Sequence, residues 1–523
     1  MNLVEVLLRQ VRERPDAPAI IEGPADDSRT LTFGDLERET ARVAGLLRAR
    51  GVGRGDAVLV LHPMAAALYV FLLALLRIGG VAMFLDPSTT GKEHVARCCR
   101  RRAPAALFAI RRAHWLRLTV PALRAIPRKF SRGGWVPGAV DIDAGTGVPF
   151  DRVEPVDAGH PALVTFTSGS TGEPKGVVRS HGFLLAQHAV LAKHLHYQAG
   201  ERDLATLPVF VLANLASGVT TVMPDADLRR VGAIEPAPVA RQIAATGASR
   251  TAASPAFMAR LCDHVEASGA PITEMRRVFV GGAPVLPNFL ERARRCFPNA
   301  EVTAVYGSTE AEPIAHVDAS RITPEDMDAM RAGKGLLAGA PVPEIDLRLL
   351  RARWGTPLGR LSAAAFDALA VRPGEVGEIV VHGRHVVAGY LDGVGDEETK
   401  FDVAGERWHR TGDLGRRDGD GRLWLMGRAG ARVEDARGVL YPFAVECAAR
   451  QLAGVRRAAL LSEGGRRLLA VEPAPGASPD ADAVRASLAW AQLDRVVLLP
   501  RIPLDARHNA KVDYPALRRA LGS

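Results

Sequence analysis

The chain has little of the material that builds disulfide frameworks, zinc sites or base-stacking surfaces. It holds five cysteines in 523 residues, and aromatic residues make up only 5% of it. Because there is no CxxC pair and no His/Cys set at metal-ligand spacing, we expect neither a zinc site nor a disulfide-stapled fold. A reducing cytoplasm fits such thiols best. The cysteines are Cys98, Cys99, Cys262, Cys296 and Cys447.

Long hydrophobic runs are also missing. The most apolar stretch, 64–76, is closed by Arg77, and it falls well short of the ~20 residues that a membrane-spanning helix needs. We therefore predict a buried helix there and no transmembrane segment. The first residues are amphipathic and carry acidic side chains early, which is not typical of a signal peptide.

The charge balance is basic, with a net charge of +9 and an isoelectric point of about 9.6. Such a balance suggests nucleic acid as a partner. The arginine-rich stretches 97–102 and 124–132, however, lack interleaved aromatic residues on which bases could stack. We interpret them as solvated basic surface and expect no nucleic-acid partner. An anionic carrier or a membrane surface stays open.

The chain is ordinary in its bulk composition, with 47% hydrophobic and 24% charged residues, which is typical of a globular protein of several domains. Its first part alternates helical patterns, at 31–50 and 64–77, with β-branched runs at 57–61 and 81–85. This alternation predicts α/β layers with largely parallel sheets. Further strands, each followed by a helix, are expected at 204–208, 249–253 and 277–280.

The pattern changes from about Gly374. Short strands at 378–381, 408–410 and 422–426 are separated by Gly/Asp turns such as 418–421, which predicts a β-rich subdomain.

We place that subdomain at about 340–427, inside a large N-terminal domain of layered αβα subdomains that spans 1–427. Residues 428–523 would form a small, mobile α+β domain of their own. Loops are expected within it at 464–465 and 472–481.

The most informative segment runs from Thr167 to Lys175 and reads Thr-Ser-Gly-Ser-Thr-Gly-Glu-Pro-Lys, after a β-branched run. Backbone N–H groups, hydroxyls and one cation in close quarters suit a polyphosphate, and Gly169 and Gly172 permit close approach because they lack a Cβ. No Gly-Lys-[Ser/Thr] triplet closes it as in a Walker A loop, and no G-x-S-x-G frame occurs in it. On its own it could also be a flexible Ser/Gly loop.

Together with later segments in matching order, this loop resembles the signature loop of the adenylate-forming superfamily, which includes acyl-CoA synthetases, luciferases and peptide-synthetase adenylation domains. The resemblance covers essentially the whole chain. It implies that the β- and γ-phosphates of ATP are held by Thr167, Ser168, Gly169, Ser170, Thr171, Gly172 and Lys175.

Val305-Tyr-Gly-Ser-Thr-Glu310 resembles the Y-G-x-T-E segment of that family. The resemblance implies that Tyr306, followed by Gly307, lies against the adenine, that Thr309 meets the α-phosphate and that Glu310 helps to hold Mg²⁺. A hard cation prefers carboxylate and phosphate oxygens. Taken alone, Thr309-Glu310 could equally be a helix start.

Three further sites follow from the resemblance. Asp413 in Thr411-Gly-Asp413 would bind the ribose hydroxyls, since a carboxylate only accepts hydrogen bonds and suits a diol. Arg428 would contact the ribose or a phosphate near the hinge, and Gly282 with Ala283 would pass beside the adenine and the acyl group. Without the resemblance, a turn Asp and an ordinary strand-to-helix turn would explain these segments.

Asn509-Ala-Lys-Val-Asp513 resembles the family's terminal N-x-x-G-K-V-D, with Ala510 in place of the usual Gly. Lys511 would then be the catalytic lysine, whose ammonium neutralises charge in the transition state. A lone terminal Lys would otherwise be assigned to the surface. The implied reaction is attack of a carboxylate on the α-phosphorus of MgATP, which gives an acyl-adenylate and pyrophosphate. The implied cofactors are ATP and Mg²⁺, with CoA left open.

The stretch after Arg428 bears on the second half-reaction. The usual hinge string G-R-x-D-x-x-K-x-x-G is altered here, and Gly430 stands where the hinge Asp normally stands. A Gly can serve as a hinge, but the usual thiol-delivery surface is changed. The chain instead resembles the olefin β-lactone synthetase branch at 207–214, 309–314, 408–413, 422–428 and 437–441.

In that branch a 2-alkyl-3-hydroxy fatty acid is adenylated, and its own 3-hydroxyl displaces AMP to give a β-lactone. Well-oriented intramolecular attack gains up to ~7–11 kcal/mol, against which the ring strain must be set. His181 and His316 are candidate bases for the hydroxyl, although a packed or exposed histidine is the alternative for each.

The acyl pocket is expected around Phe210, Val211 and Ala213, with His181 nearby, although an apolar stripe of this kind is also typical of a core. Glu312 either faces that pocket, which would imply a polar or cationic group on the substrate, or faces solvent.

Two other functions stay open at this point. The chain could be an acyl-CoA or carrier-protein ligase, which passes the acyl group to a thiol. It could also be a non-catalytic nucleotide-binding relative, against which the intact Lys511, Glu310 and phosphate loop argue. The expected small-molecule partners are ATP and a carboxylic acid, and association with other biosynthetic enzymes or a carrier protein is possible.

Overall fold

The computed structural model describes residues 1–522, apart from 86–90, 145–147, 169–173, 352 and 505–510. The chain divides into two units that are each discontinuous in sequence. The first unit comprises Met1–Ala252 and Arg384–Asp396, and the second comprises Ala253–Gly383 and Glu397–Ser523. The domain boundary expected at residue 428 is not the division between these units and stays a prediction.

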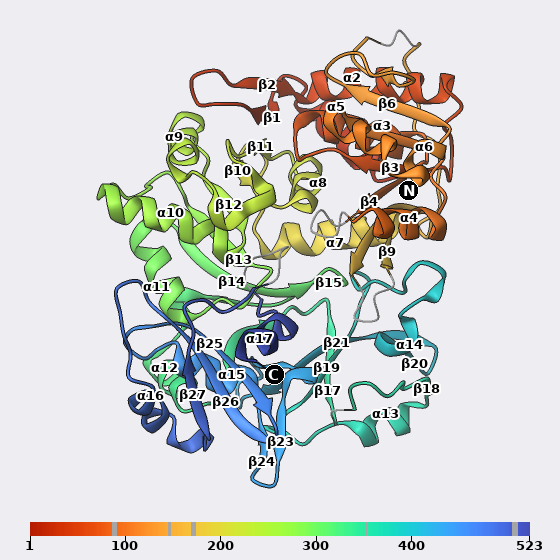
Figure 1. The fold of residues 1–523 in the computed structure, drawn as a ribbon. Coiled ribbons are helices and arrows are strands. Elements are labelled where there is room, and N and C mark those ends of the chain that lie inside the picture. The colour runs from red at the N-terminus through yellow and green to blue at the C-terminus, as the bar shows by residue number, and fades with distance from the viewer. Residues whose placement is uncertain (86–90, 145–147, 169–173, 352, 505–510, 523) are drawn as a thin grey trace. The chain divides into compact units, whose positions relative to one another are not determined.

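A mainly parallel sheet forms one part of the first unit, in the order β7-β6-β5-β3-β4-β8-β9 (Figure 1). Neighbouring strands are parallel except for the antiparallel pair β8–β9. The strands predicted at 57–61 and 81–85 are confirmed. The bounds are β3 (Ala57–Leu61), β4 (Val81–Leu85), β5 (Ala106–Ile110), β6 (Arg128–Arg132), β7 (Val140–Asp141), β8 (Pro161–Ser168) and β9 (Pro174–Ser180).

The same unit contains a second row of strands, in the order β12-β10-β11-β1-β2. The strand predicted at 204–208 lies earlier than expected, because Pro208 is the first residue of a helix and its ring suits that position. The bounds are β1 (Pro18–Glu22), β2 (Arg29–Thr32), β10 (Arg202–Ala205), β11 (Thr220–Val222) and β12 (Arg250–Ala253).

Helices cover these sheets. The predicted helix at 31–50 begins at Phe33, because the Thr32 side chain accepts from the Asp35 N–H and the Asp35 carboxylate accepts from the Thr32 N–H. Every residue of α3 is buried, as predicted for the apolar stretch. The bounds are α1 (Val4–Glu13), α2 (Phe33–Ala49), α3 (Ala66–Arg77), α4 (Lys92–Arg101), α5 (Arg111–His114), α6 (Pro121–Ala125), α7 (His181–His194), α8 (Pro208–Ala216) and α9 (Pro236–Thr246). In the described part of the chain, no helix has the length and apolar character needed to cross a membrane.

The second unit contains strands in the order β17-β19-β21-β22-β16-β15-β14-β13 (Figure 1). Only β13–β14 is parallel in this order, and the short strands predicted at 378–381, 408–410 and 422–426 are present as β19, β21 and β22. The bounds are β13 (Arg277–Gly281), β14 (Glu301–Ser308), β15 (Ala311–Asp318), β16 (Leu336–Pro341), β17 (Asp346–Leu350), β18 (Arg360–Leu361), β19 (Gly377–His382), β20 (Lys400–Val403), β21 (Glu406–Arg417) and β22 (Leu423–Arg428).

Helices in this part of the second unit begin at prolines or capped residues, as their sequences favour. The predicted turn at 418–421 is also present, and the Asp418 carboxylate accepts from the N–H groups of Asp420 and Arg422. The helix bounds are α10 (Pro255–Ser268), α11 (Pro287–Cys296), α12 (Pro324–Arg331), α13 (Ala363–Leu369) and α14 (Asp396–Thr399).

The C-terminal residues build an α+β layer with a core of their own. The loop expected at 472–481 was placed too early, because Glu472 belongs to β26 and its buried carboxylate binds Arg457 and the Ile502 N–H at 2.6 and 2.8 Å. The bounds are β23 (Val433–Asp435), β24 (Gly438–Leu440), α15 (Pro442–Ala449), β25 (Val455–Glu463), β26 (Arg466–Pro473), α16 (Ala481–Ser487), β27 (Arg495–Leu498) and α17 (Tyr514–Leu521).

Candidate active site

The predicted phosphate loop is carried by the β8–β9 hairpin of the first unit. Thr167 pairs with Lys175 and Ser168 with Pro174, so the backbone brings both ends of the loop together. Residues 169–173, which include Gly169, Ser170, Thr171 and Gly172, lie outside the described residues. At the two ends of the loop, the structure describes the side chain of Lys175 but not those of Thr167 and Ser168. The Lys175 side chain is half-buried.

Lys175 runs closely past Gly395, a residue that the sequence analysis did not single out. A Cβ on Gly395 would lie 2.8 Å from both Cδ and Cε of Lys175 and 3.1 Å from its Nζ, and Gly395 has φ +98°. The positive φ favours glycine at this position, and a larger residue would also force the Lys175 side chain to move. The Val177–Tyr390 bridge holds the segment around Gly395 against β9. Its significance depends on this long-range contact, so no local sequence pattern could have revealed it.

Three predicted nucleoside-binding residues meet in the second unit. The Tyr306 hydroxyl on β14 donates to one oxygen of Asp413 on β21 at 2.8 Å, and the Arg428 guanidinium at the end of β22 donates to the other at 3.0 Å. A carboxylate has about four lone-pair sites, so Asp413 keeps capacity to accept from a diol. Burial, together with the Asp413 charge, raises the pKa of Tyr306 well above its usual range.

The Asp413 backbone is fixed by its neighbours in β21. The Asp413 N–H donates to the Thr411 hydroxyl at 3.0 Å, and that hydroxyl donates to the Ile379 carbonyl at 2.9 Å. Arg410 makes two parallel hydrogen bonds to Glu378 at 2.7 and 2.9 Å, and both side chains are almost fully buried. These hydrogen bonds fix β21, the strand that carries Asp413, to β19.

Thr309 and Glu310 form the turn between β14 and β15, and both are half-buried. The helix-start alternative for this pair is wrong, because β15 continues antiparallel to β14 directly after the turn. Among the described residues, no group of three or more His, Cys, Asp or Glu side chains could hold a metal ion. A single carboxylate nevertheless fits Mg²⁺, which commonly binds one or two protein carboxylates together with substrate phosphates and water.

Two buried basic residues, which the sequence analysis did not assign, lie on β20 and β21, and the charge of Glu310 acts on one of them. His409 pairs with Lys400 across β20 and β21, and both are 3% exposed. Burial and the Lys400 charge lower the pKa of His409 to about 3, against the opposing effect of Glu310. His409 is therefore neutral at pH 7. Its place in the segment 408–413, which resembles the β-lactone synthetase branch, was the signal in the sequence that could have revealed it.

Gly282 and Ala283 occupy the turn between β13 and α11, as predicted. Gly282 is exposed with φ +80°, a conformation that favours glycine, and Ala283 is half-buried. The parallel pair β13–β14 places this turn near the predicted adenine-binding residue Tyr306, because Gly281 lies opposite Val305. Val305 is directly followed by Tyr306, so the turn and the Tyr306 segment leave the same end of the sheet.

Lys511 is exposed and follows a segment that lies outside the described residues. The chain after it is well anchored, since Val512 pairs with Leu504 and the Tyr514 hydroxyl donates to Glu446 at 3.0 Å. Burial raises the pKa of Glu446 to about 7. The contacts of Val512 and Tyr514 therefore anchor the chain directly after Lys511.

Comparison with known proteins agrees with this geometry. A family model described as AMP-binding enzyme matches residues 7–391. The chain belongs to the AMP-binding enzymes. It is 33% identical to an olefin beta-lactone synthetase of Stenotrophomonas maltophilia and 31% identical to one of Xanthomonas campestris, each over 98% of this chain and 96% of the relative. The structure of an amide bond synthetase from Marinactinospora thermotolerans, 23% identical, covers 99% of both chains with a TM-score of 0.80.

These findings make the protein an adenylate-forming ligase with the α/β fold predicted for it. They also favour the branch that the sequence resembles, because the two beta-lactone synthetases match nearly the whole chain. A relative with this identity and coverage shares the family.

The acyl-pocket residues predicted on α8 are buried. Phe210 is 5%, Val211 0% and Ala213 4% exposed, and Val211 belongs to the main hydrophobic core of the first unit. Burial alone is what either a pocket wall or a core helix would show, so the acyl-binding role stays a prediction. Glu312 lies half-buried in β15, which leaves both interpretations of it open.

His181 is a packed histidine. It is fully buried at the start of α7, and its Nδ1 accepts from the Leu3 N–H at 3.0 Å. Burial, followed by the nearby His160, lowers its pKa to about 4. With Nδ1 occupied and the proton on Nε2, this ring has no free lone pair for a substrate hydroxyl, which favours the packing alternative over a role as base.

The altered stretch after Arg428 folds into the β23–β24 hairpin, whose tip is held by ion pairs. Arg437 contacts Asp435 and Asp494, each at 2.7 Å, and Arg467 contacts Asp435 at 2.8 Å. The hydrogen bond from the Arg437 guanidinium, followed by that from the Arg467 N–H, lowers the pKa of Asp494 to about 2. The segment that differs from the usual hinge string is thus tied to the β25-β26-β27 sheet.

Proposed function

We propose that this AMP-binding enzyme activates an apolar 3-hydroxy acid as its adenylate and then closes the adenylate to a β-lactone. The observation that carries the proposal is the likeness to two olefin beta-lactone synthetases over nearly the full length of all three chains. The segments of resemblance include those that flank the altered hinge string, which is where the second half-reaction is decided.

In the first half-reaction, the substrate carboxylate oxygen attacks the α-phosphorus of ATP, the bond between the α-phosphorus and the bridging oxygen breaks, and pyrophosphate leaves. Lys175 and its loop bind the departing phosphates, and Asp413, held by Tyr306 and Arg428, accepts from the ribose hydroxyls. Lys511 neutralises the charge that develops on the attacked phosphate. Positioning and charge stabilisation supply most of the catalysis in such transfers.

Thr309 and Glu310 serve the metal and the α-phosphate in this scheme. Mg²⁺, when bound to Glu310 and the phosphate oxygens, offsets the negative charge of the triphosphate. The position of Glu310 in a tight turn next to β14 suits that role, since the same strand carries Tyr306.

In the second half-reaction, the 3-hydroxyl oxygen attacks the acyl carbon, the bond from this carbon to the AMP oxygen breaks, and AMP leaves. The hydroxyl proton passes to a base, for which His316, half-buried in β15, is the candidate that remains. The anchored hairpin around Arg437 supports a reaction without a thiol, because the usual thiol-delivery string is replaced there.

The test is incubation with MgATP and syn or anti 2-alkyl-3-hydroxy acids, with and without CoA, followed by mass spectrometry of the products. We expect a product that has lost water relative to the acid, with no requirement for CoA. A thioester that forms only with CoA, and nothing beyond an adenylate without it, would refute the lactone step.

The variant Lys511→Ala tests whether this lysine acts in the first half-reaction, and ATP binding by the same variant shows that the protein is still folded. We expect it to abolish pyrophosphate release while ATP still binds in calorimetry, because the lysine acts in the transition state. The exposed Lys92→Ala, which removes the same charge elsewhere, is the control. Unchanged pyrophosphate release in Lys511→Ala would show that another residue performs this task.

A further inference from the structure

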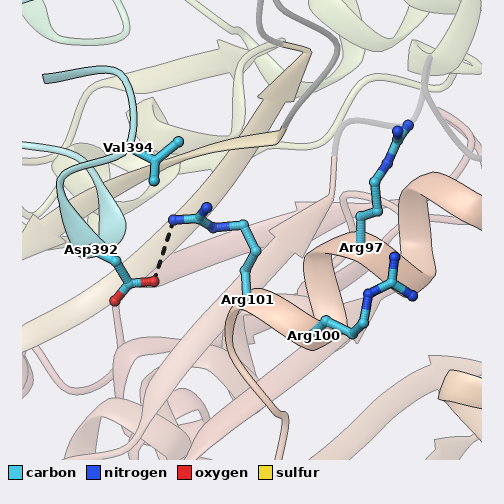
Figure 2. Close-up of a pocket in the computed structure, with 5 residues that line it drawn as sticks. All are labelled: Arg97, Arg100, Arg101, Asp392 and Val394. Carbon is cyan, nitrogen blue, oxygen red and sulfur yellow. Dashed lines mark hydrogen bonds and ion pairs between the residues drawn. The ribbon is translucent and has the colours of Figure 1, made fainter. Parts of the chain in front are cut away.

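A hollow of about 450 Å³ opens in the first unit, and none of the residues that line it has been given a role above. Arg97, Arg100 and Arg101 line it from α4, and Asp392 and Val394 line it from the segment that follows Leu391. Figure 2 shows Arg101 reaching across to Asp392, with Arg97 and Arg100 beside it on the same helix.

The charge of this hollow is unbalanced. Residues at i, i+3 and i+4 share one side of a helix, where like charges repel each other. Asp392 is the one carboxylate among the lining residues; it contacts Arg101 at 3.3 Å and is itself 62% exposed. Arg100 and Arg101 in the last turn are favourable for the helix dipole, but that effect does not account for Arg97. Three arginines and one exposed carboxylate line the hollow, and this excess of positive charge favours an anionic ligand.

Unsatisfied donors point the same way. The Nε–H groups of Arg97 and Arg101 are buried, and no acceptor for them exists in the described part of the chain. A buried donor without a partner destabilises the folded chain, because it has lost its hydrogen bonds to water. A ligand with several anionic oxygens would satisfy these donors, and guanidinium groups match phosphate oxygens in geometry as well as in charge.

The location of the hollow narrows the choice of anion. Val394 directly precedes Gly395, which touches the Lys175 side chain. The helix that carries the three arginines also packs against β9, the strand that carries Lys175. The hollow therefore borders the lysine that is assigned to the departing phosphates of ATP.

We propose that this hollow binds inorganic pyrophosphate as a second site beside Lys175. The inference rests on the proposed function, because pyrophosphate is the leaving group of the first half-reaction. A cationic site next to Lys175 attracts pyrophosphate away from the α-phosphorus. This opposes the reverse reaction, in which pyrophosphate attacks the acyl-adenylate. No bond is formed or broken in the hollow.

The test is calorimetric titration of the full chain with magnesium pyrophosphate, in the presence of saturating α,β-methylene ATP. This analogue occupies the phosphate loop and cannot be attacked with loss of pyrophosphate, so any remaining pyrophosphate binding reports a second site. The test variant is Arg97→Ala/Arg100→Ala, which leaves the Arg101–Asp392 pair intact. The matched control is Arg9→Ala/Arg12→Ala, which removes the same charge from exposed positions on α1.

We expect the wild type and the control to bind pyrophosphate under these conditions, and the test variant to bind it at least about tenfold more weakly, which corresponds to 1.4 kcal/mol. Product inhibition by pyrophosphate in the adenylation assay should weaken in the same variant while the KM for ATP is unchanged. Equal binding in the test variant, or no binding to the wild type once the analogue is present, would overturn the proposal.

Two further arms identify the source of the anion and keep the inferences separate. If CoA, and not pyrophosphate, binds with the same dependence on Arg97 and Arg100, the hollow serves the phosphate of an acceptor and the pyrophosphate proposal is wrong. Because the titration needs no acid and no turnover, it gives its result whether or not the enzyme forms a lactone. A failed lactone assay would thus leave this result standing.

Discussion

Gly395 shows how one backbone position can constrain the side chain of Lys175, which is predicted to bind phosphate. The Lys175 methylene groups lie where a Cβ would stand, and the positive φ adds a second reason for glycine. Gly393, two residues earlier, also has a positive φ, but no atom lies within 4 Å of its Cβ position. Gly393 thus has a positive φ without a contact to Lys175, so the two glycines form a pair for mutation.

We predict that Gly395→Ala raises the KM for ATP by about tenfold, equivalent to 1.4 kcal/mol of binding, because Lys175 must move. Gly393→Ala should cost similar backbone strain but leave the KM for ATP within about twofold, a difference too small to indicate a lost contact. Steady-state pyrophosphate release at varied ATP measures both. If the two variants raise the KM equally, strain in the segment, and not Lys175, is responsible.

At the scale of elements, β21 depends on the buried pair Arg410–Glu378. The two parallel hydrogen bonds and the 1% and 2% exposure of the side chains leave no solvent to compensate a missing partner. We predict that Glu378→Gln destabilises the second unit by roughly 3–5 kcal/mol, because Arg410 is then a buried unpaired charge. The urea midpoint of unfolding measures the loss.

The double variant Glu378→Leu/Arg410→Met is the control for this pair. Since it removes both charges, it should be more stable than Glu378→Gln, as for other buried pairs replaced by apolar groups. A double variant that is less stable than the single one would mean that packing of the Arg410 stem, and not its charge, holds β21.

The hydrogen bond from Tyr514 of α17 to Glu446 of α15 leads to a second prediction at the scale of elements. The buried Glu446 has a pKa of about 7 against an ordinary 4.5, so between these values the folded chain keeps a proton that the unfolded chain has lost. The unfolding free energy therefore falls as the pH rises from 4.5 to 7. Glu446→Gln keeps an oxygen to accept from Tyr514 and Leu460.

We predict that Glu446→Gln stabilises the protein at pH 8 by on the order of 2 kcal/mol and changes little at pH 4.5. Thermal unfolding across this pH range measures it, with the exposed Glu13→Gln as the control for loss of a charge. A variant that is equally stable relative to wild type at both pH values would contradict the raised pKa.

For the whole molecule, the question is whether the chain moves at Gly430 between its two half-reactions. Gly430 is not among the residues with positive φ, and its Cβ position meets only the Trp354 ring at 3.7 and 3.8 Å, an ordinary contact. Alanine is therefore compatible with the observed backbone and should stabilise the fold by about 0.4–1 kcal/mol through the unfolded state.

If this glycine is the hinge, we predict that Gly430→Ala leaves pyrophosphate release unchanged but slows the second step, so that acyl-adenylate accumulates relative to lactone. Mass spectrometry of quenched reactions measures the ratio. Gly427→Ala is the contrasting variant, because φ +109° and the Pro442 ring at 3.0 Å make alanine unfavourable there. An unchanged ratio in Gly430→Ala would place the hinge elsewhere.

Much of the fold follows from local patterns, because the period of hydrophobic residues determines whether a segment can cover a core as a strand or as a helix. The strands 57–61 and 81–85 and the capped start of α2 illustrate this, since each is set by neighbouring residues. The misplaced strand near Pro208 and the misplaced loop at Glu472 have other causes. Pro208 begins a helix that packs on distant elements, and Glu472 is held by Arg457 and Ile502 from other parts of the chain.

The sequence by itself determined the family, because its phosphate loop and later motifs resemble those of the adenylate-forming superfamily in the same order, and this resemblance implies ATP-dependent activation of an acid. Lys175, Glu310, Asp413 and Lys511 could be named on that ground. Only the tertiary structure decided which residues meet. Tyr306 and Arg428 both donate to Asp413, and Lys175 lies against Gly395. The Nδ1 atom of His181 accepts from the Leu3 N–H. Such contacts join residues far apart in sequence, and their free energy depends on distance and burial, which exist only once the chain has folded.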